Sequence, residues 1–456
     1  MSTTRYASVL GLGFGDCGKG HFVDALTRRW QAHTVVRFNG GAQAGHNVVT
    51  PAAANSPARH HTFSQIGAGT LVPGVRTLLV DPMIVHPTAL LVEAELLGRS
   101  RVQDALSRLT IDAQCRITTP FHQAAGRLRE LLRGAAAHGT CGVGVGETVR
   151  HALEHPEQAL RYFDLAPSTA SNARTLLDRL QRIRETLLAE FGPQCPKGSV
   201  GALSGEFQTL QDETLAAKWM ASACALARHC PPGSFDAICC QLRQPGCALF
   251  EGAQGVFLDQ WRGFHPHTTW SSINTAAADS VAARFGIEAP IEHYGVLRTY
   301  LTRHGAGPLP TYDESLDSLL PEPHNRGDGW QGHFRRGHPD AVLLRYALGA
   351  AGGLSGLLVS HLDVFQRGLS LKWCERYSLA PALPQWPREV ARLPLGIGED
   401  LGHQLTLTQL LHSARPQYNA DVLRSVPDFL DCISGVTSLP VALGSYGATC
   451  ADIREQ

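Results

Sequence analysis

The chain has 456 residues, 43% of them hydrophobic, and its 40 lysines and arginines balance 40 aspartates and glutamates. This composition fits a globular protein with a substantial core, and the balanced charge provides no net field to attract nucleic acid or a membrane surface. The N-terminal segment is polar and no apolar run is long enough to span a bilayer, so we expect a cytoplasmic enzyme.

The first predicted strand, residues 7–10, runs into the segment Gly11-Leu-Gly-Phe-Gly-Asp-Cys-Gly-Lys-Gly20, and a helix is predicted over residues 21–30. A strand that ends in glycines before a helix directs backbone N–H groups and the positive end of the helix dipole towards one point. The segment therefore predicts a binding site for a phosphate group.

Two templates fit this segment. Gly13, Gly18 and Lys19 have the P-loop spacing G-x-x-x-x-G-K, although Gly20 stands where the Mg²⁺-binding serine or threonine belongs. Gly13, Gly15 and Gly18 also satisfy the dinucleotide fingerprint G-x-G-x-x-G. Spacing alone therefore leaves both a nucleoside triphosphate and a dinucleotide open.

The charged residues favour a nucleoside triphosphate over NADP. Asp16 and Lys19 inside the loop suit metal and phosphate chemistry, whereas a dinucleotide site requires an acidic residue about 20 positions later. The chain has Arg37 there, which could serve only a 2′-phosphate.

Further along the chain, predicted strands alternate with predicted helices. Apolar residues at three- and four-residue intervals indicate helices over residues 89–97, 121–137 and most of 172–230. Most of the predicted strands end in a polar or glycine-rich segment, and they are residues 34–38, 77–80, 248–250, 295–300, 357–360 and 441–443. The predicted fold class is α/β, with a mostly parallel central sheet flanked by helices and the polar segments along one of its edges.

One domain is expected over residues 1–456, because no clear linker divides the chain. It has a helical excursion at about residues 150–230 and a loop-rich peripheral region at about residues 375–435. A second glycine-rich segment, residues 139–146, is either a flexible connection or another anion site to which Thr140 contributes a hydroxyl.

Five segments, in their order along the chain, resemble the motifs of the adenylosuccinate synthetase family. They are Gly15-Asp-Cys-Gly-Lys-Gly20, Val36-Arg-Phe-Asn-Gly-Gly-Ala-Gln-Ala-Gly-His46, Phe250-Glu-Gly-Ala-Gln-Gly255, Thr302-Arg-His-Gly-Ala-Gly-Pro-Leu-Pro-Thr311 and Leu362-Asp363. The resemblance extends from about residue 7 to about residue 453. It implies an adenylosuccinate synthetase-like fold with a P-loop-like GTP site.

The resemblance also implies a GTP- and Mg²⁺-dependent carbon–nitrogen ligase of purine nucleotide biosynthesis. In that family the γ-phosphate of GTP is transferred to O6 of IMP, and the amino group of aspartate then displaces phosphate to give adenylosuccinate. The implied partners are these small molecules, and the implied assembly is a homodimer.

Three residues match the catalytic groups of the family. Asp16 matches the base that removes the N1 proton of the purine and also contacts Mg²⁺, for which the Gly45 carbonyl matches a second contact. His46 matches the general acid near the β- and γ-phosphates. Gln254 matches the side chain that holds the base and supports the oxyanion developing at its 6-position.

Further matches concern nucleotide binding. The residues matched to GTP are Gly15, Gly18, Lys19, Gly20, Arg335, His361, Asp363, Ser445 and Gly447. Asp363 matches the carboxylate that selects guanine, and His361 stands where a lysine usually lies along the guanine face. The residues matched to the acceptor nucleotide are Asp16, Gln43, Thr140, Gln254, Thr269 and His333. Of these, Gln43 replaces the usual asparagine.

Residues 325–338 depart from the family. The threonines that surround the substrate carboxylates are absent, and Trp330 and Gln331 stand near their place. His333 occupies the position of an arginine linked to the ribose and the aspartate, whereas Arg335 is retained. These changes leave the identity of the amino-acid substrate open.

Residues 147–158 also depart from the family. There the family has an arginine that reaches across a dimer interface to the 5′-phosphate of IMP, and only Arg150 is available here. Cys141 stands where a phosphate-binding threonine usually lies. The acceptor is therefore also left open.

Three functions are compatible with the sequence. The first is adenylosuccinate synthetase activity. The second is a paralogous GTP-driven ligase that joins another amine to another acceptor. The third is an NADP-dependent oxidoreductase or a non-catalytic nucleotide-binding protein. In an oxidoreductase, Asp16, His46 and Gln254 would have no role in hydride transfer.

Overall fold

The computed structural model describes residues 4–52, 58–195, 201–322, 324–325 and 329–456. Ten strands of these ranges form a central sheet in the order β17-β16-β12-β9-β1-β8-β2-β5-β6-β7. Neighbouring strands pair in parallel, except that β17 is antiparallel to β16. The strands are β1 (Arg5–Gly11), β2 (Ala32–Arg37), β5 (Arg76–Leu79), β6 (Leu109–Asp112), β7 (Pro232–Gly233), β8 (Cys247–Glu251), β9 (Ile291–Arg298), β12 (Gly356–Ser360), β16 (Val441–Ser445) and β17 (Ile453–Glu455).

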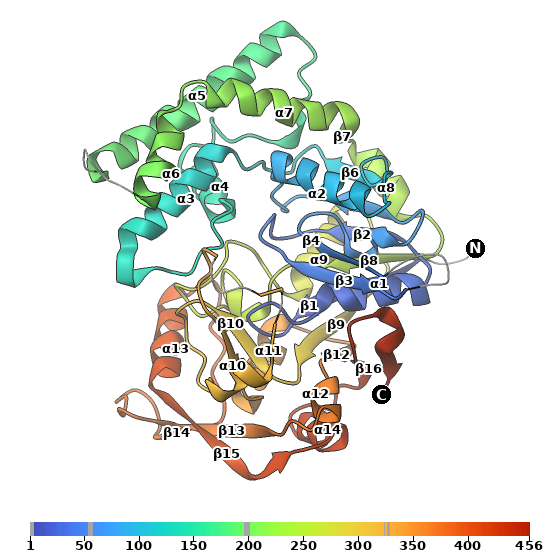
Figure 1. The fold of residues 1–456 in the computed structure, drawn as a ribbon, viewed down its shortest axis with the longest axis vertical. Coiled ribbons are helices and arrows are strands. Elements are labelled where there is room, and N and C mark those ends of the chain that lie inside the picture. The colour runs from blue at the N-terminus through green and yellow to red at the C-terminus, as the bar shows by residue number, and fades with distance from the viewer. Residues whose placement is uncertain (1–3, 53–57, 196–200, 323, 326–328) are drawn as a thin grey trace.

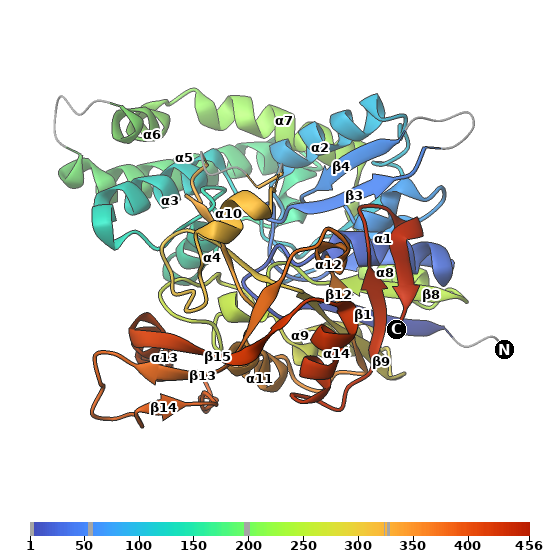
Figure 2. The same cartoon turned by 60° about the horizontal axis from the view of Figure 1, so that its bottom comes forward.

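Helices surround this sheet, as the two ribbon views show (Figure 1, Figure 2). They are α1 (Lys19–Arg29), α2 (Pro87–Arg99), α3 (Pro120–Arg133), α4 (Val145–Glu154), α5 (Ala170–Phe191), α6 (Ala202–Gln211), α7 (Leu215–His229), α8 (Phe235–Leu242), α9 (Thr275–Arg284), α10 (Ser315–Leu319), α11 (Ala341–Ala351), α12 (Asp363–Gln366), α13 (Leu401–Ser413) and α14 (Val426–Ser434). The predicted α/β class with a mostly parallel sheet is confirmed.

The sequence of β1 explains why helices lie on both faces of the sheet. Successive side chains of a strand point to opposite faces. Ala7 and Val9 join the core cluster that contains α1, whereas Tyr6 and Leu10 join the cluster that contains α8 and α9. Because β1 is buried on both faces, it reads as a continuous apolar run.

Two peripheral regions flank the sheet. Helices α3 to α7 gather at one end of the molecule, and an antiparallel sheet of β13 (Leu371–Leu379), β14 (Glu389–Val390) and β15 (Ala414–Leu423) lies at the other (Figure 1). The predicted loop-rich region at about 375–435 is therefore more regular than expected, and irregular backbone dominates it only between residues 380 and 400.

Two short hairpins complete the part of the fold that surrounds the strand ends. One pairs β3 (His46–Thr50) with β4 (Arg59–Phe63), and the other pairs β10 (Leu301–His304) with β11 (Phe334–Gly337). The segment after β9, expected to be a polar loop, thus forms strand β10. Across the described ranges, every helix is too short or too polar to cross a membrane.

Candidate active site

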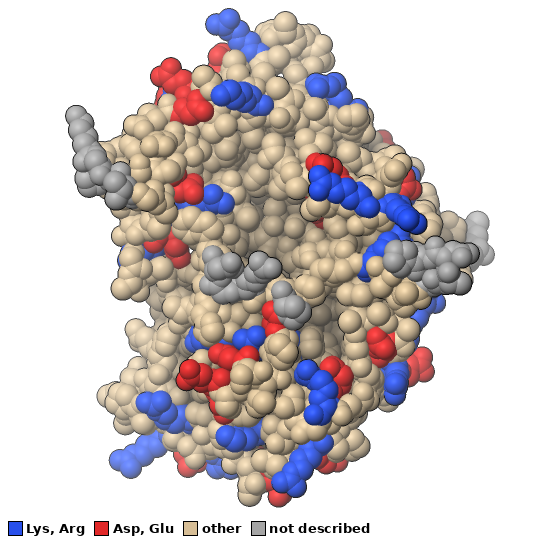
Figure 3. All heavy atoms as spheres, viewed as in Figure 1, with Lys and Arg blue, Asp and Glu red and all other residues tan. Residues whose placement is uncertain are grey.

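A cavity of about 440 Å³ lies beside the glycine-rich loop that follows β1. Five of the residues matched to the acceptor nucleotide line it, and they are Asp16, Gln43, Thr140, Gln254 and Thr269. In the space-filling view, the visible face is hollowed near its centre, with acidic and basic side chains interspersed around the hollow (Figure 3). The fold therefore brings together residues from five separate segments of the chain.

The glycine-rich loop leads directly into α1. Gly18, the N-cap of α1, has a φ of 91° and its helix end has no side-chain cap, so the first backbone N–H groups of the helix are available for an anion. A Cβ atom at Gly20 would lie 2.6 Å from the Cβ atom of His46, so only glycine allows this approach. Lys19 is buried and its Nζ atom contacts the Gln254 carbonyl oxygen. The close approach places His46 beside the predicted phosphate loop.

Asp16 is held by its backbone. Its φ of 49° is in the left-handed region that glycine favours, and its carbonyl oxygen accepts a hydrogen bond of 2.9 Å from Nη1 of Arg298. The carboxylate is left for other contacts: its side chain is 30% exposed, and Oδ2 lies 3.9 Å from Nε2 of His304. This arrangement presents a carboxylate at the junction between the loop and the cavity.

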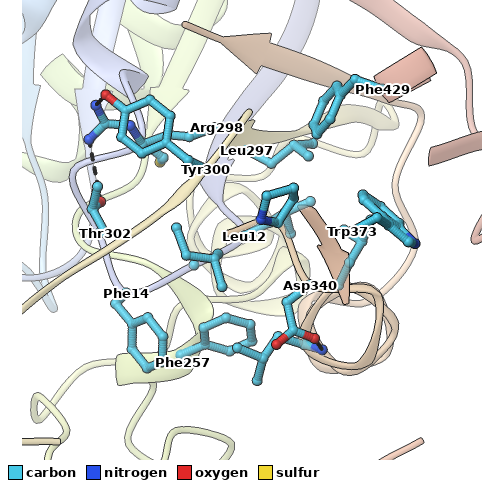
Figure 4. Close-up of a pocket in the computed structure, with 17 residues that line it drawn as sticks. Leu12, Phe14, Phe257, Leu297, Arg298, Tyr300, Thr302, Asp340, Trp373 and Phe429 are labelled. Carbon is cyan, nitrogen blue, oxygen red and sulfur yellow. Dashed lines mark hydrogen bonds between the residues drawn. The ribbon is translucent and has the colours of Figure 1, made fainter. Parts of the chain in front are cut away.

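Arg298 positions this loop, and sequence reasoning missed it. Its guanidinium also contacts the Tyr300 hydroxyl, Thr302 and the Glu322 carboxylate. Figure 4 shows Arg298 beside Tyr300 and Thr302, next to a second, mainly apolar cavity of about 40 Å³ that extends beneath the loop. Arg298 lies within the predicted strand 295–300 and ends β9, but its contacts with Asp16 and Glu322 join residues that are distant in sequence.

His46 forms a buried pair with Glu251. Nδ1 of His46 lies 2.5 Å from Oε1 of Glu251, and the other carboxylate oxygen accepts the N–H of Ala68 at 2.9 Å. This contact places a proton on Nδ1, so Nε2 carries none in the neutral ring. Nε2 is buried without a hydrogen-bond partner among the described residues. Burial lowers the pKa of His46 to about 4, although the Glu251 carboxylate acts in the opposite direction. His46 is therefore neutral at pH 7.

Arg37 is fully buried beneath this pair. Burial raises the pKa of Glu251, but the neighbouring Arg37 guanidinium and His46 outweigh it and keep that pKa below its usual value. Arg37 thus supplies the counter-charge for a buried carboxylate. This role, rather than contact with a 2′-phosphate of NADP, explains the arginine that ends β2.

Two glutamine amides face the cavity without partners. Both polar side-chain atoms of Gln43 and of Gln254 are buried and form no hydrogen bond among the described residues. Gln254 has a φ of 56°, another left-handed value outside glycine. Buried polar atoms are nearly always paired in folded proteins, so these amides indicate where a ligand with donors and acceptors, such as a purine base, would bind.

The cavity has one wall built from α3, the following loop and α4, here called the helical wall. The arginines that line it are Arg129, Arg133 and Arg150, and each contacts a carboxylate. Glu130 lies in the same wall, 7% exposed, and accepts the N–H groups of Gly139 and Thr140. The second glycine-rich segment is thus a structured loop whose amides are already engaged.

Arg303 and His304 of β10 also line the cavity, and the antiparallel pair of β10 and β11 is here called the hairpin wall. Arg303 is the cross-strand partner of Arg335 on β11, which does not line the cavity, so two like charges stand opposite each other. Each guanidinium donates to a carbonyl oxygen, Arg303 to that of Pro308 and Arg335 to that of Gly307, and neither has a carboxylate partner among the described residues. Burial, and then the neighbouring Arg335, lower the pKa of Arg303. The uncompensated positive charge of Arg303 favours an anionic ligand in the cavity.

The predicted guanine-binding residues lie at the ends of two adjacent strands. His361 and Asp363 follow β12, Ser445 ends β16, and these strands pair in parallel. The Ser445 hydroxyl donates to the Gly447 carbonyl oxygen at 2.9 Å and lies 3.0 Å from Nε2 of His21. The structure thus places these four predicted residues at one edge of the sheet.

The ring of His361 is fixed by its neighbours. Its Nε2 accepts a hydrogen bond of 2.8 Å from Arg298, and its Nδ1 lies 2.9 Å from the Ser360 hydroxyl. Burial and the Arg298 charge lower the pKa of His361. Both ring nitrogens are therefore engaged with the protein, and His361 ties β12 to the loop after β1.

His333 is not brought to the cavity lining. Its side chain is 64% exposed, and Nε2 lies 3.1 Å from Oδ2 of Asp317. Nearby, Gln331 does line the cavity, and Trp330 packs close to Gly142 and Arg127 of the helical wall. Residues 326–328 of the same predicted segment lie outside the described residues.

Taken together, the glycine-rich loop at the end of a central strand, the carboxylate within it and the unpartnered amides define an α/β enzyme that binds a phosphorylated nucleotide. Residues 8–451 match the sequence profile of the adenylosuccinate synthetase family. The chain is a member of that family, whose activity is GTP-dependent carbon–nitrogen ligation.

Individual relatives agree with this assignment. An adenylosuccinate synthetase of Shewanella amazonensis is 32% identical over 81% of this chain and 79% of its own length. One of Myxococcus xanthus is 29% identical over 96% of both chains. The structure of fully ligated adenylosuccinate synthetase from Plasmodium falciparum has a TM-score of 0.74, with 19% identity, over 99% of this chain and 100% of that one. Neither an oxidoreductase nor a ligase for a different acceptor is favoured by these similarities.

Proposed function

We propose that this chain transfers the γ-phosphate of GTP to O6 of IMP and then joins aspartate to the activated purine, giving adenylosuccinate, GDP and phosphate. The observation that carries this proposal is the single cavity into which Asp16, Gln43 and Gln254 all face, beside the phosphate loop. Family membership supports the same reaction.

Asp16 is the proposed base for the N1 proton of IMP. Its carboxylate has no strong internal partner, and its strained backbone fixes its direction towards the cavity. Removing the N1 proton concentrates negative charge on O6, which then attacks the γ-phosphate. The unpartnered amide of Gln254 is placed to stabilise that charge through a hydrogen bond.

Lys19 and the amides at the start of α1 are the proposed holders of the β- and γ-phosphates. His46 is the proposed acid beside them, because Gly20 allows its close approach. A triphosphate would raise the pKa of His46, since negative charge stabilises the imidazolium. Glu251 would hold the ring in place throughout.

Mg²⁺ fits the residues present. Within the described ranges, no cluster of three or more histidine, cysteine, aspartate or glutamate side chains could hold a metal. Mg²⁺ is commonly bound through one or two carboxylates together with substrate phosphates. The partly exposed Asp16 carboxylate and the carbonyl of Gly45, an exposed residue, would hold the ion, which would neutralise phosphate charge when bound.

Guanine specificity is proposed to rest on Asp363, Ser445 and Gly447. The Asp363 side chain is 30% exposed, and Nε of Arg367 lies 3.6 Å from its Oδ2 atom, beyond hydrogen-bond distance. The carboxylate is therefore available to accept two N–H groups of guanine. His361, whose ring is held by Arg298, is the proposed residue along the guanine face.

Arg303, which lines the cavity, is the proposed contact for the anionic groups of the second half-reaction, and Arg335 opposite it is the proposed contact for the triphosphate of GTP. The anionic groups of the second half-reaction are the leaving phosphate and the carboxylates of aspartate. The exchange of the family's threonines for Trp330 and Gln331 removes two hydroxyl donors from this side, so the guanidinium pair is the remaining source of charge. We further propose a homodimer in the cytoplasm, which light scattering of the purified chain and localisation of a tagged copy will test.

The reaction is tested with purified protein, GTP, Mg²⁺, IMP and aspartate, by following adenylosuccinate and phosphate together. Product should form with GTP and not with ATP, and omission of aspartate should prevent it. Phosphate release with another amino acid in place of aspartate, and no adenylosuccinate, would contradict the proposed amino-acid substrate.

A further inference from the structure

His46 is supported by its backbone and by its ring, and both supports lead to one short segment of the chain. Its backbone on β3 pairs with that of Phe63, the last residue of β4. Its ring contacts Glu251, whose second carboxylate oxygen accepts the N–H of Ala68. The two supports therefore meet in residues 64–68, here called the bracing segment, which begins directly after Phe63 and ends at Ala68.

The bracing segment is bound through its backbone to the carboxylate of Glu93, on α2. Oε1 of Glu93 accepts the N–H of Ser64 at 2.9 Å and that of Ile66 at 3.2 Å, and Oε2 accepts the N–H of Gln65 at 2.9 Å. Consecutive backbone N–H groups of this kind form a nest that suits an anion. Because Glu93 is only 5% exposed, water is a poor substitute for its oxygens.

Two further contacts fix the bracing segment between α2 and the central sheet. The Gln65 amide donates to the carbonyl oxygen of His86 at 3.1 Å and accepts the N–H of His86 at 2.7 Å. His86 is the N-cap of α2, the helix that carries Glu93. On the opposite side, a Cβ atom at Gly67 would lie 2.8 Å from Cγ1 of Val35 on β2, so the segment packs directly against the sheet.

Glu93 must be ionised to satisfy these N–H groups. A carboxylate only accepts hydrogen bonds, whereas a protonated acid or an amide turns a donor towards the segment. Burial raises the pKa of Glu93 to about 7, although the N–H groups of Gln65 and Ser64 and the charge of Arg37 oppose this effect. The ionised form therefore predominates at pH 8.

We propose that Glu93 is a positioning residue for His46, which it orients through the bracing segment. This inference rests on the proposed function, in which His46 is the acid beside the β- and γ-phosphates. Glu93 does not line the cavity, so it contacts no substrate there. Its loss should consequently impair the catalytic step, through a displaced His46, and leave the binding of GTP intact.

The test compares the wild-type chain with Glu93→Gln and Glu93→Asp at pH 8, by steady-state kinetics and by calorimetric binding of GTP. In Glu93→Gln, kcat should fall about tenfold or more while the KM and Kd of GTP stay within about threefold, because a catalytic group misplaced by about 1 Å can cost about 100-fold. Glu93→Asp keeps both acceptor oxygens, one methylene further from the segment, and should show a smaller loss of kcat.

A double-mutant cycle with His46→Gln separates positioning from a general structural effect. If Glu93 acts through His46, Glu93→Gln should lower the kcat of the His46→Gln enzyme by less than about threefold, since residues that act together are not additive. Additive losses in the double variant would overturn the proposal. So would an undiminished kcat in folded Glu93→Gln, with folding checked by the thermal unfolding midpoint.

Asp112→Asn is the matched control. Asp112 ends β6, is 6% exposed, and accepts the N–H of Gln114 at 2.9 Å and that of Asp81 at 3.3 Å, besides pairing with Arg284. It is thus another buried carboxylate that holds backbone outside the cavity lining. Its replacement should lower the thermal unfolding midpoint and leave kcat within about threefold of wild type. A loss of kcat equal to that in Glu93→Gln would contradict the positioning role.

A measurement without turnover completes the test. The nitrogen NMR signals of the His46 ring, assigned by their absence from His46→Gln, should shift in Glu93→Gln or in Glu93→Asp and stay unchanged in Asp112→Asn. Unchanged signals in both Glu93 variants would overturn the inference. Failure of the proposed ligation would instead appear as absent adenylosuccinate with the wild-type chain, whatever the ring signals show.

Discussion

The two walls of the cavity treat their arginines in opposite ways. In the helical wall, Arg129 and Arg150 contact carboxylates at less than 3 Å, and the charges are balanced within the protein. In the hairpin wall, Arg303 and Arg335 stand opposite each other across two strands, with Nε atoms that have no partner among the described residues. A buried charge without a partner is costly in a folded protein.

This difference separates arginines that support the fold from arginines that are free to bind a ligand. The arginines of the helical wall are neutralised by carboxylates, whereas Arg303 and Arg335 donate only to the carbonyl oxygens of Pro308 and Gly307 and have no carboxylate partner among the described residues. The hairpin wall is therefore the wall on which the anions of the reaction are expected.

Replacing Asp16 by asparagine should have the largest effect. The change keeps the shape of the side chain but removes the proposed base between the phosphate loop and the hairpin wall. Adenylosuccinate formation should fall about 1,000-fold or more, while GTP binding measured by calorimetry persists. The control is Asp279→Asn, an exposed carboxylate (52%) that pairs with His293. Activity within tenfold of wild type in Asp16→Asn would exclude this residue as the base.

Exchanging arginine for methionine in each wall tests the comparison directly. Arg303→Met should lower kcat/KM about 100-fold while the free energy of unfolding is maintained or rises by up to about 1 kcal/mol, because an unpaired buried charge is removed. Arg129→Met should instead lower the free energy of unfolding by about 2 kcal/mol, because Glu147 and Glu190 lose a partner. Urea denaturation measures both. Equal destabilisation by the two changes would break the distinction between the walls.

His46→Gln should reduce turnover by about 100-fold, since a positioned general acid contributes at least that much. The glutamine amide retains a donor for Glu251, so the buried carboxylate is not left alone. Steady-state kinetics with GTP as the varied substrate should show the loss in kcat. A loss confined to the KM of GTP would assign His46 to binding rather than to proton donation.

The smallest effect concerns pH and the helical wall. Burial lowers the pKa of His122, on α3, to about 3, and an unfolded histidine has a pKa of about 6.5. The folded state therefore binds fewer protons, so the stability associated with neutral His122 is complete above about pH 6.5 and is lost as the pH falls towards 3. His122→Gln should thus be less stable than wild type at pH 7, by about 1 kcal/mol, and this gap should close near pH 6 and reverse by about pH 5. Calorimetric unfolding measures it, with the exposed His229→Gln as the control, and a gap independent of pH would contradict the prediction.

Much of the fold could be predicted because parallel strands have strong local signals. The apolar runs of β1, β8 and β12 and the glycines that follow them are visible in the sequence, and parallel strands place their carboxyl ends at one edge. The residues at those ends, Asp16, Gln254 and Asp363, were therefore predictable as a group.

The partners within the site were not predictable. The contact of His46 with Glu251 joins residues 205 positions apart, and that of Arg298 with the Asp16 carbonyl joins residues 282 apart. Glu130 is only nine positions from Gly139, yet its role depends on how the loop turns back onto α3. The like-charged Arg303 and Arg335 follow from the strand register, which no motif specifies. Spacing indicates which residues meet a ligand, whereas pairing depends on the complete fold.

The backbone offers an independent marker of the same chemistry. Among the described residues, five other than glycine have positive φ, and three of them are Asp16, Gln254 and His361. Each such conformation costs about 1 to 3 kcal/mol and persists only where the surroundings impose it. Arg298 holds two of these three residues, because its guanidinium donates to the carbonyl oxygen of Asp16 and to Nε2 of His361. One buried side chain at the end of β9 therefore fixes strained backbone after two neighbouring strands, β1 and β12.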